Sequence, residues 1–180
     1  MVTLDPSKRW GVGNITPWWG TSHRDLPYIN EPFNDVASLD YWNQLGYTQT
    51  KFTGDMYDMR NPEPHWMSEF KTYYSGWKHF SWSVYKMTPG CVLPNHADTY
   101  DRFKHIYNVS DAESIYRSII FLEDWQSGHY FEIDHVPFTN WTAGTVVTWQ
   151  NDTVHLAANV GMTDRYTLQI TGVADENTFL

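Results

Sequence analysis

The chain has 180 residues, and its 21 acidic against 12 basic side chains give a formal net charge of -9. This acidity, with no basic run to offset it, excludes nucleic acid as an expected partner because it would repel the phosphate backbone. Aromatic residues make up 17% of the sequence and charged residues only 18%, a composition that excludes a disordered chain and predicts a single folded domain over residues 1–180.

The sequence carries no sign of a membrane or of an oxidising compartment. Its first residues lack the apolar core of a signal peptide, and no apolar run approaches the roughly 20 residues that a membrane-spanning helix requires. The single cysteine, Cys91, has no partner for an intrachain disulfide. We therefore expect a cytoplasmic protein that makes no contact with a membrane.

Residues 1–79 are predicted to form an irregular segment that covers the rest of the fold. Five prolines between positions 17 and 64 interrupt them, and Trp and Tyr are scattered among polar residues. The clearest helical pattern is "NDVASLDYWNQLG" at 34–46, which ends at Gly46. We expect this N-terminal part to wrap around a core that the rest of the chain forms.

The stretch "HRDLPYIN", from His23 to Asn30, matches the protein-kinase catalytic-loop pattern letter for letter. A kinase needs a complete nucleotide-binding lobe before this loop, and only 22 residues precede His23. No D-F-G motif follows it. We therefore interpret the match as a coincidence and predict a polar surface turn closed by Pro27.

From residue 80 onward the pattern changes to short strands separated by turn-forming clusters. Six segments alternate polar with apolar residues or are rich in β-branched and aromatic ones: 80–87, 114–122, 129–134, 144–149, 155–160 and 165–172. Several short strands at this spacing are typical of a sandwich or jelly-roll barrel. The sequence therefore predicts a mainly β fold with some α structure, in which an N-terminal cover (1–79) packs on a jelly-roll core (80–172).

Three residues of the predicted core could hold one metal ion. His96 and Asp98 form an H-x-D triplet, and side chains two apart on an extended chain point the same way. His155, 57 residues beyond Asp98, could contribute from a second strand. Two imidazoles and one carboxylate leave three octahedral positions open, which is typical of non-haem Fe(II) oxygenases. A packed histidine and an unrelated surface pair are the alternatives.

A cation and a hydroxyl follow the third candidate ligand. Arg165 comes ten residues after His155, and Thr167 comes two residues after Arg165. Their spacing places them on one face of a strand, where a guanidinium and a hydroxyl can together receive a carboxylate inside the barrel.

These residues resemble the 2-oxoglutarate and Fe(II)-dependent oxygenases, whose signature is H-x-D, a distal His, and an Arg about ten residues later with Ser or Thr at plus two. The C-terminal segment looks closest to the aspartyl/asparaginyl β-hydroxylase and bacterial proline hydroxylase branch, with the motif H-x-x-x-N-x-x-x-x-x-R-x-x-L. The positions that fill this motif are His155, Asn159, Arg165 and Leu168. The similarity covers residues 80–172, about half of the chain.

The resemblance implies a double-stranded β-helix, a cupin-like jelly roll, that binds Fe(II) through His96, Asp98 and His155. 2-Oxoglutarate would chelate the iron, with its C5 carboxylate on Arg165 and Thr167, and O₂ would take the last position. The reaction would hydroxylate an unactivated C–H bond of an amino-acid, peptidyl or small-metabolite substrate and release succinate and CO₂. Asp98 departs from the H-x-G of the aspartyl β-hydroxylases proper and favours hydroxylation over halogenation.

Further candidates are less specific. Arg102 and Arg117 are the remaining cations nearest the motifs and are candidates for receiving a substrate carboxylate, with a surface salt bridge as the alternative. Trp149 and Phe131 are expected to be barrel core rather than substrate platforms.

Two other classes of protein stay open. A cupin-type metalloenzyme would use the same barrel and ligands without 2-oxoglutarate, and it would have no need for Arg165 with Thr167. A non-enzymatic jelly-roll binding or virion module would use its Trp and Tyr clusters to bind sugar or a partner chain, and it would be stable without metal.

Overall fold

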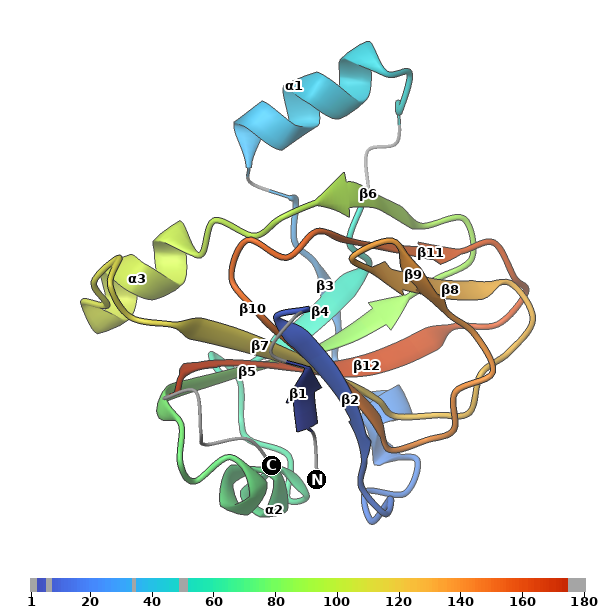
Figure 1. Cartoon of the computed structure of the whole chain (residues 1–180). Helices are drawn as coiled ribbons and strands as arrows, with labels where there is room; N and C mark the ends of the chain where they lie inside the picture. The colour runs from blue at the N-terminus through green and yellow to red at the C-terminus, as the bar shows by residue number, and fades with distance from the viewer. Residues whose placement is uncertain (1–2, 6–7, 34, 49–51, 175–180) are drawn as a thin grey trace.

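The computed structural model describes residues 3–5, 8–33, 35–48 and 52–174, and it consists of two antiparallel β-sheets that face each other, with the smaller above the larger in Figure 1. The eight-stranded sheet has the order β1-β2-β10-β7-β12-β5-β4-β3. Its strands are β1 (Thr3–Asp5), β2 (Trp10–Asn14), β3 (Ile29–Asn30), β4 (Asp55–Asp58), β5 (Lys78–Met87), β7 (Ile115–Phe121), β10 (Thr145–Gln150) and β12 (Arg165–Val173).

The four-stranded sheet has the order β6-β11-β8-β9, made of β6 (Val92–His96), β11 (His155–Asn159), β8 (His129–Ile133) and β9 (Val136–Phe138). The helices are α1 (Val36–Gln44), α2 (Met67–Tyr73), α3 (Asp101–Tyr107) and a 3₁₀ turn, η1 (Ser22–Asp25). Helix α2 covers the outer face of the large sheet, and α1 lies above β6 (Figure 1).

The predicted jelly-roll fold is confirmed, and each of the six predicted strands is present within one or two residues of its expected bounds. The predicted helix at 34–46 is α1, whose N-cap Asp35 accepts hydrogen bonds from the backbone N–H groups of Ala37 and Ser38. The N-terminal part is more regular than expected. It adds β1 and β2 to one edge of the large sheet and β3 and β4 to the other, so it extends the sheet as well as covering it.

The strand β12 shows how the large sheet separates a core from a cavity. Tyr166, Leu168 and Ile170 point outward into a buried cluster with residues of α2. The alternate residues of β12 point to the other face, between the two sheets. Polar residues thus occupy the inner face, and apolar residues hold the helix.

A second core lies between the sheets. Phe131 and Trp149 are each 1% exposed and pack together there, so the prediction that they belong to the barrel core is confirmed. The ring of Trp149 also lies 4.8 Å from that of His155, which holds this histidine from one side.

The predicted surface turn is present as η1, in which Ser22, Arg24 and Asp25 are exposed, but the expectation that His23 itself lies at the surface is wrong. His23 lies in η1 with no exposed surface, and its Nε2 is 2.8 Å from Glu123 Oε1. The backbone carbonyl of His23 accepts a hydrogen bond from the Tyr28 hydroxyl. The imidazole of His23 and the ring of Tyr166 pack in an edge-to-face arrangement. The imidazole is buried because Glu123, a hundred residues away in the sequence, supplies the polar partner that burial requires.

None of the helices in the described part of the chain is long and apolar enough to cross a membrane. Cys91 is a buried free thiol.

Candidate active site

A cavity of about 860 Å³ lies between the two sheets, and all seven candidate site residues from the sequence line it. His96, Asp98 and His155 belong to its upper wall, which the small sheet forms. Arg117, Arg165 and Thr167 project from the large sheet, and Arg102 reaches in from α3.

The three candidate metal ligands come together at the edge of the small sheet. His96 ends β6, His155 begins β11, and these two residues are direct partners in the antiparallel ladder. Asp98 follows β6 and turns back toward both imidazoles. Its Oδ1 lies 3.9 Å from His96 Nε2, and its Oδ2 lies 3.4 Å from His155 Nε2. One ligand atom from each residue lies within 4.8 Å of the others, which is close enough for a single ion.

Both imidazoles present the same nitrogen to the centre of this group. His96 Nδ1 is 2.8 Å from the carbonyl oxygen of Pro94, and His155 Nδ1 is 3.1 Å from that of Thr153. A carbonyl oxygen only accepts, so each Nδ1 carries the proton and each Nε2 keeps its lone pair. This is the tautomer that a metal-binding histidine adopts when a backbone carbonyl orients it.

The protonation states also suit a cation. Burial and the neighbouring His96 lower the pKa of His155 to about 4, and burial lowers the pKa of His96. Burial acts to raise the pKa of Asp98, but the Arg117 guanidinium and the two imidazoles outweigh it and lower the pKa to about 2. Near neutral pH the set therefore comprises two neutral imidazoles and one carboxylate.

Asp98 Oδ2 is a buried oxygen that lies between Arg117 and the Nε2 of His155. Arg117 Nη1 lies 2.5 Å from Asp98 Oδ2, so the guanidinium compensates part of the charge of this carboxylate. The lone pairs of His96 Nε2 and His155 Nε2, 3.9 and 3.4 Å from the two oxygens, still face this negative charge, which is unfavourable unless a cation lies between them. Two oriented Nε2 lone pairs and this oxygen therefore fit a divalent metal ion.

Arg165 is a buried cation to which the described part of the chain offers no acidic partner. Arg165 is 6% exposed, and its Nη1 donates a hydrogen bond to the Tyr130 carbonyl oxygen at 2.6 Å. Its buried Nε has no acceptor among the described residues. Among the described residues no carboxylate forms an ion pair with it. Burial lowers its pKa to about 10, so it stays charged near neutral pH. An uncompensated guanidinium facing a cavity fits an anionic ligand.

Thr167 follows Arg165 on the same face of β12 and is 4% exposed. Tyr85 on β5 is its direct ladder partner. Asn159 and Leu168, the other two residues of the resemblance motif, have structural roles. Asn159 donates to the carbonyls of Met87 and Thr163 and so fixes the turn between β11 and β12, and Leu168 is buried in the outer core.

Sequence reasoning missed the polar part of the cavity floor, formed by Ser81, Ser83, Gln169 and Thr171, and the ion pairs of Glu31 at the cavity mouth. A signal for the floor was present in the sequence. In 80–87 and 165–172 polar residues alternate with large apolar ones, which predicts one polar face on each strand.

Neither a scan against protein-family models nor a search of curated proteins finds a match to this sequence. Solved structures do match. The crystal structure of a prolyl-4-hydroxylase from Pseudomonas putida has a TM-score of 0.60 and 13% identity, with 94% of each chain covered. A prolyl 4-hydroxylase from Phytophthora capsici has a TM-score of 0.50 and 13% identity, covering 96% of this chain and 61% of that one.

At these identities the comparisons establish the fold alone. The chain shares its double-stranded β-helix fold with these two prolyl 4-hydroxylases. The chemistry of the site rests on the residues that line the cavity.

Proposed function

We propose that this protein is an Fe(II)- and 2-oxoglutarate-dependent dioxygenase that hydroxylates an unactivated C–H bond of its substrate. The observation that carries the proposal is that Arg165, a buried cation without a carboxylate partner among the described residues, shares one cavity with two neutral imidazoles and a carboxylate. The first feature fits a dicarboxylate co-substrate, and the second fits the iron that it would chelate.

Iron, when bound, supplies the activation of O₂ that is coupled to decarboxylation of 2-oxoglutarate to succinate and CO₂. The side chains of the protein would hold and orient the metal and the co-substrate. The carbonyls of Pro94 and Thr153 keep Nε2 of His96 and His155 available. Arg165 and Thr167 would receive the C5 carboxylate, and the apolar side chains of Met87, Leu93 and Phe131 would exclude water from that end of the cavity.

The alternatives explain fewer of these features. In a cupin-type metalloenzyme without 2-oxoglutarate, burial of the unpaired Arg165 would lower the stability of the fold, and no anionic ligand would compensate for this loss. A non-enzymatic jelly-roll module would bear the same cost and would gain nothing from a carboxylate that faces the lone pairs of two imidazoles. Amino-acid, peptidyl and small-metabolite substrates all fit a cavity of about 860 Å³.

Calorimetric titration tests this proposal without the need to know the substrate. One Mn(II) should bind per chain, and 2-oxoglutarate should bind more tightly to the Mn(II)-loaded protein than to the protein in EDTA. His96→Ala should remove both effects, whereas the matched control His105→Ala, at an exposed position of α3, should leave them unchanged. Failure of wild-type protein to bind Mn(II), or equal binding of 2-oxoglutarate with and without metal, would refute the proposal.

A further inference from the structure

The register of two strands divides the cavity floor into two ends. Successive ladder partners on β12 and β5 are Arg165 with Met87, Thr167 with Tyr85, Gln169 with Ser83, and Thr171 with Ser81. All eight side chains line the cavity. The row runs for roughly 20 Å, at about 3.3 Å for each residue of β12. Arg165 and Thr167 occupy one end, and hydroxyl and amide groups occupy the other.

The hydroxyl end has hydrogen-bonding capacity that the protein leaves unused. Within the described chain the side chains of Ser81, Ser83 and Gln169 make no hydrogen bond to protein, although all three line the cavity. Thr171 accepts one hydrogen bond, from Arg117 Nε at 3.3 Å. Together these groups offer several donors and acceptors to a polar ligand.

This end of the floor adjoins the candidate metal ligands. Arg117 contacts Thr171 on one side and Asp98 on the other. A molecule resting on Gln169 and Thr171 would therefore lie beside the ion, on the side away from Arg165. The molecule to be hydroxylated, called the prime substrate, needs this position when 2-oxoglutarate occupies the Arg165 end.

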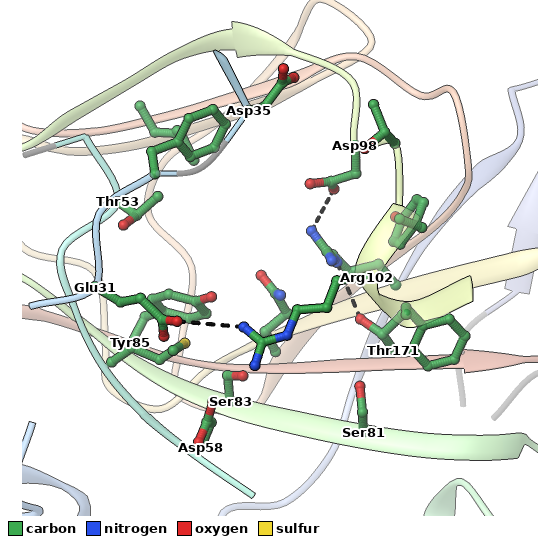
Figure 2. A pocket seen from close by; sticks show the side chains of 18 of the residues that line it. Glu31, Asp35, Thr53, Asp58, Ser81, Ser83, Tyr85, Asp98, Arg102 and Thr171 are labelled. Carbon is green, nitrogen blue, oxygen red and sulfur yellow. Dashed lines mark hydrogen bonds and ion pairs between the residues drawn. The ribbon is translucent and has the colours of Figure 1, made fainter. Parts of the chain in front are cut away.

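Among the described arginines at this end of the cavity, Arg102 has the longest contact with an acidic partner. Its Nη1 lies 3.5 Å from Glu31 Oε1, and Figure 2 shows its side chain reaching toward Glu31 above the strand that carries Ser81 and Ser83. Glu31 lies closer to Arg60, at 2.5 Å, and Arg60 also pairs with Asp58 at 2.8 Å. If Arg102 turned to another anion, both acids would keep Arg60.

Resting on the proposed function, we infer that the end of the cavity floored by Ser81, Ser83, Gln169 and Thr171 is the subsite for the prime substrate, and that it takes a polar molecule bearing a carboxylate that Arg102 receives. A carboxylate would give Arg102 a two-point partner in place of its single long contact. Substrate hydroxyl or amide groups would pair with the floor. A cationic group would have to compete with Arg60, which already pairs with both Glu31 and Asp58.

The test uses the full chain loaded with Zn(II) and saturated with 2-oxoglutarate, so that the Arg165 end is filled. The probes are three acids, each with its own primary amide: N-acetylserine, N-acetylglutamine and gluconate. Saturation-transfer NMR measures their binding to wild type, Arg102→Gln, Glu31→Gln and the control Arg24→Gln. Arg24 is a surface arginine paired with Glu123 outside the cavity.

At least one acid should bind wild type about tenfold or more tightly than its amide, and Arg102→Gln should remove that preference while Arg24→Gln keeps it. Glu31→Gln should tighten binding of the acid, because Arg102 loses its competing carboxylate. The inference is overturned if no acid is preferred over its amide in wild type, if Arg102→Gln retains the preference, or if Glu31→Gln weakens binding.

The outcome is separable from that of the proposed function. 2-Oxoglutarate binding is measured first in the same samples, and its absence would remove the oxygenase proposal. A preference for acids that persists in Arg165→Gln but disappears in Arg102→Gln would still assign the carboxylate to the hydroxyl end of the cavity.

Discussion

The guanidinium of Arg117, whose side chain is 15% exposed, lies 2.5 Å from Asp98 Oδ2, so the carboxylate of the candidate metal site already faces a cation of the protein. Arg117 is held in place, because it lies over the ring of Tyr100 at 4.7 Å and donates to Thr171. A fixed cation beside the carboxylate orients Asp98 before a ligand arrives. A divalent ion would therefore share Asp98 with Arg117.

Replacing Arg117 with Met should destabilise the metal-free protein, because Asp98 is left as a buried carboxylate without a cation. The expected loss is about 3 kcal/mol of unfolding free energy, which is typical of a broken buried ion pair. Mn(II) would replace the missing positive charge. The rise in Tm on adding Mn(II) should therefore be larger in Arg117→Met than in wild type, as measured by thermal unfolding in EDTA and in Mn(II).

Arg24→Met is the matched control for this change, because Arg24 pairs with Glu123 but its side chain is 53% exposed. It should cost less stability than Arg117→Met and leave the Mn(II)-induced rise in Tm as it is in wild type. An Mn(II)-induced rise in Arg117→Met no larger than that of wild type would contradict the assigned role of Arg117.

The sequence contains two H-x-D triplets, His23-Arg24-Asp25 and His96-Ala97-Asp98, and mutation of their histidines should have different effects. His23→Ala removes the buried partner of Glu123 and should lower the unfolding free energy by about 1–3 kcal/mol while Mn(II) binding persists. His96→Ala should abolish Mn(II) binding. Denaturant unfolding and calorimetry measure the two effects, and loss of Mn(II) binding in both variants would show that the site has been misplaced.

The metal-free protein should lose stability as the pH falls from about 6.5 toward 4. The pKa of His155 is lowered to about 4 in the fold, whereas an unfolded histidine titrates near 6.5. Between these values the unfolded chain binds more protons, so stability is full above pH 6.5 and is lost on acidification. Unfolding in EDTA should show a shallower loss for His155→Gln, and an identical pH profile would count against this burial of His155.

Thr167→Val should weaken 2-oxoglutarate binding without affecting the metal. The loss of one buried hydrogen bond to a charged group costs about 1–3 kcal/mol, which corresponds to roughly 5- to 150-fold in affinity. Thr171→Val is the matched control, because it lies on the same face of β12 at the other end of the cavity. Calorimetry with Mn(II)-loaded protein should separate the two variants, and equal affinities would place the C5 carboxylate elsewhere.

Local pattern made much of the site predictable. The spacing of His96, Asp98 and His155 predicted a group that the ladder between β6 and β11 brings together. Polar residues at every second position also carried a signal for the inner faces of β5 and β12, although the polar floor itself was not predicted. Arg165 and Thr167 followed from the same period of two.

Long-range pairing made the rest unpredictable. Strand β2 reads "WGVGN", whose two glycines give a weak strand signal, and it forms by pairing with β10 more than 130 residues away. His23 is buried only because Glu123 lies opposite it. Arg117 projects from β7 of the large sheet and pairs with Asp98, which follows β6 of the small sheet. No regular spacing in the sequence indicates that these two residues are in contact.

The central claim is that Arg165 receives the distal carboxylate of 2-oxoglutarate bound beside iron. Titrating anaerobic Fe(II)-loaded protein with 2-oxoglutarate tests it directly, because chelation to Fe(II) produces a visible charge-transfer band. Wild type should develop this band and saturate. Arg165→Ala should require a hundredfold or more 2-oxoglutarate, as expected for roughly 3–5 kcal/mol from a buried charge left unpaired, while Fe(II) affinity stays the same. No band in wild type, or saturation of Arg165→Ala at the wild-type concentration, would contradict the account and favour a cupin-type metalloenzyme without 2-oxoglutarate.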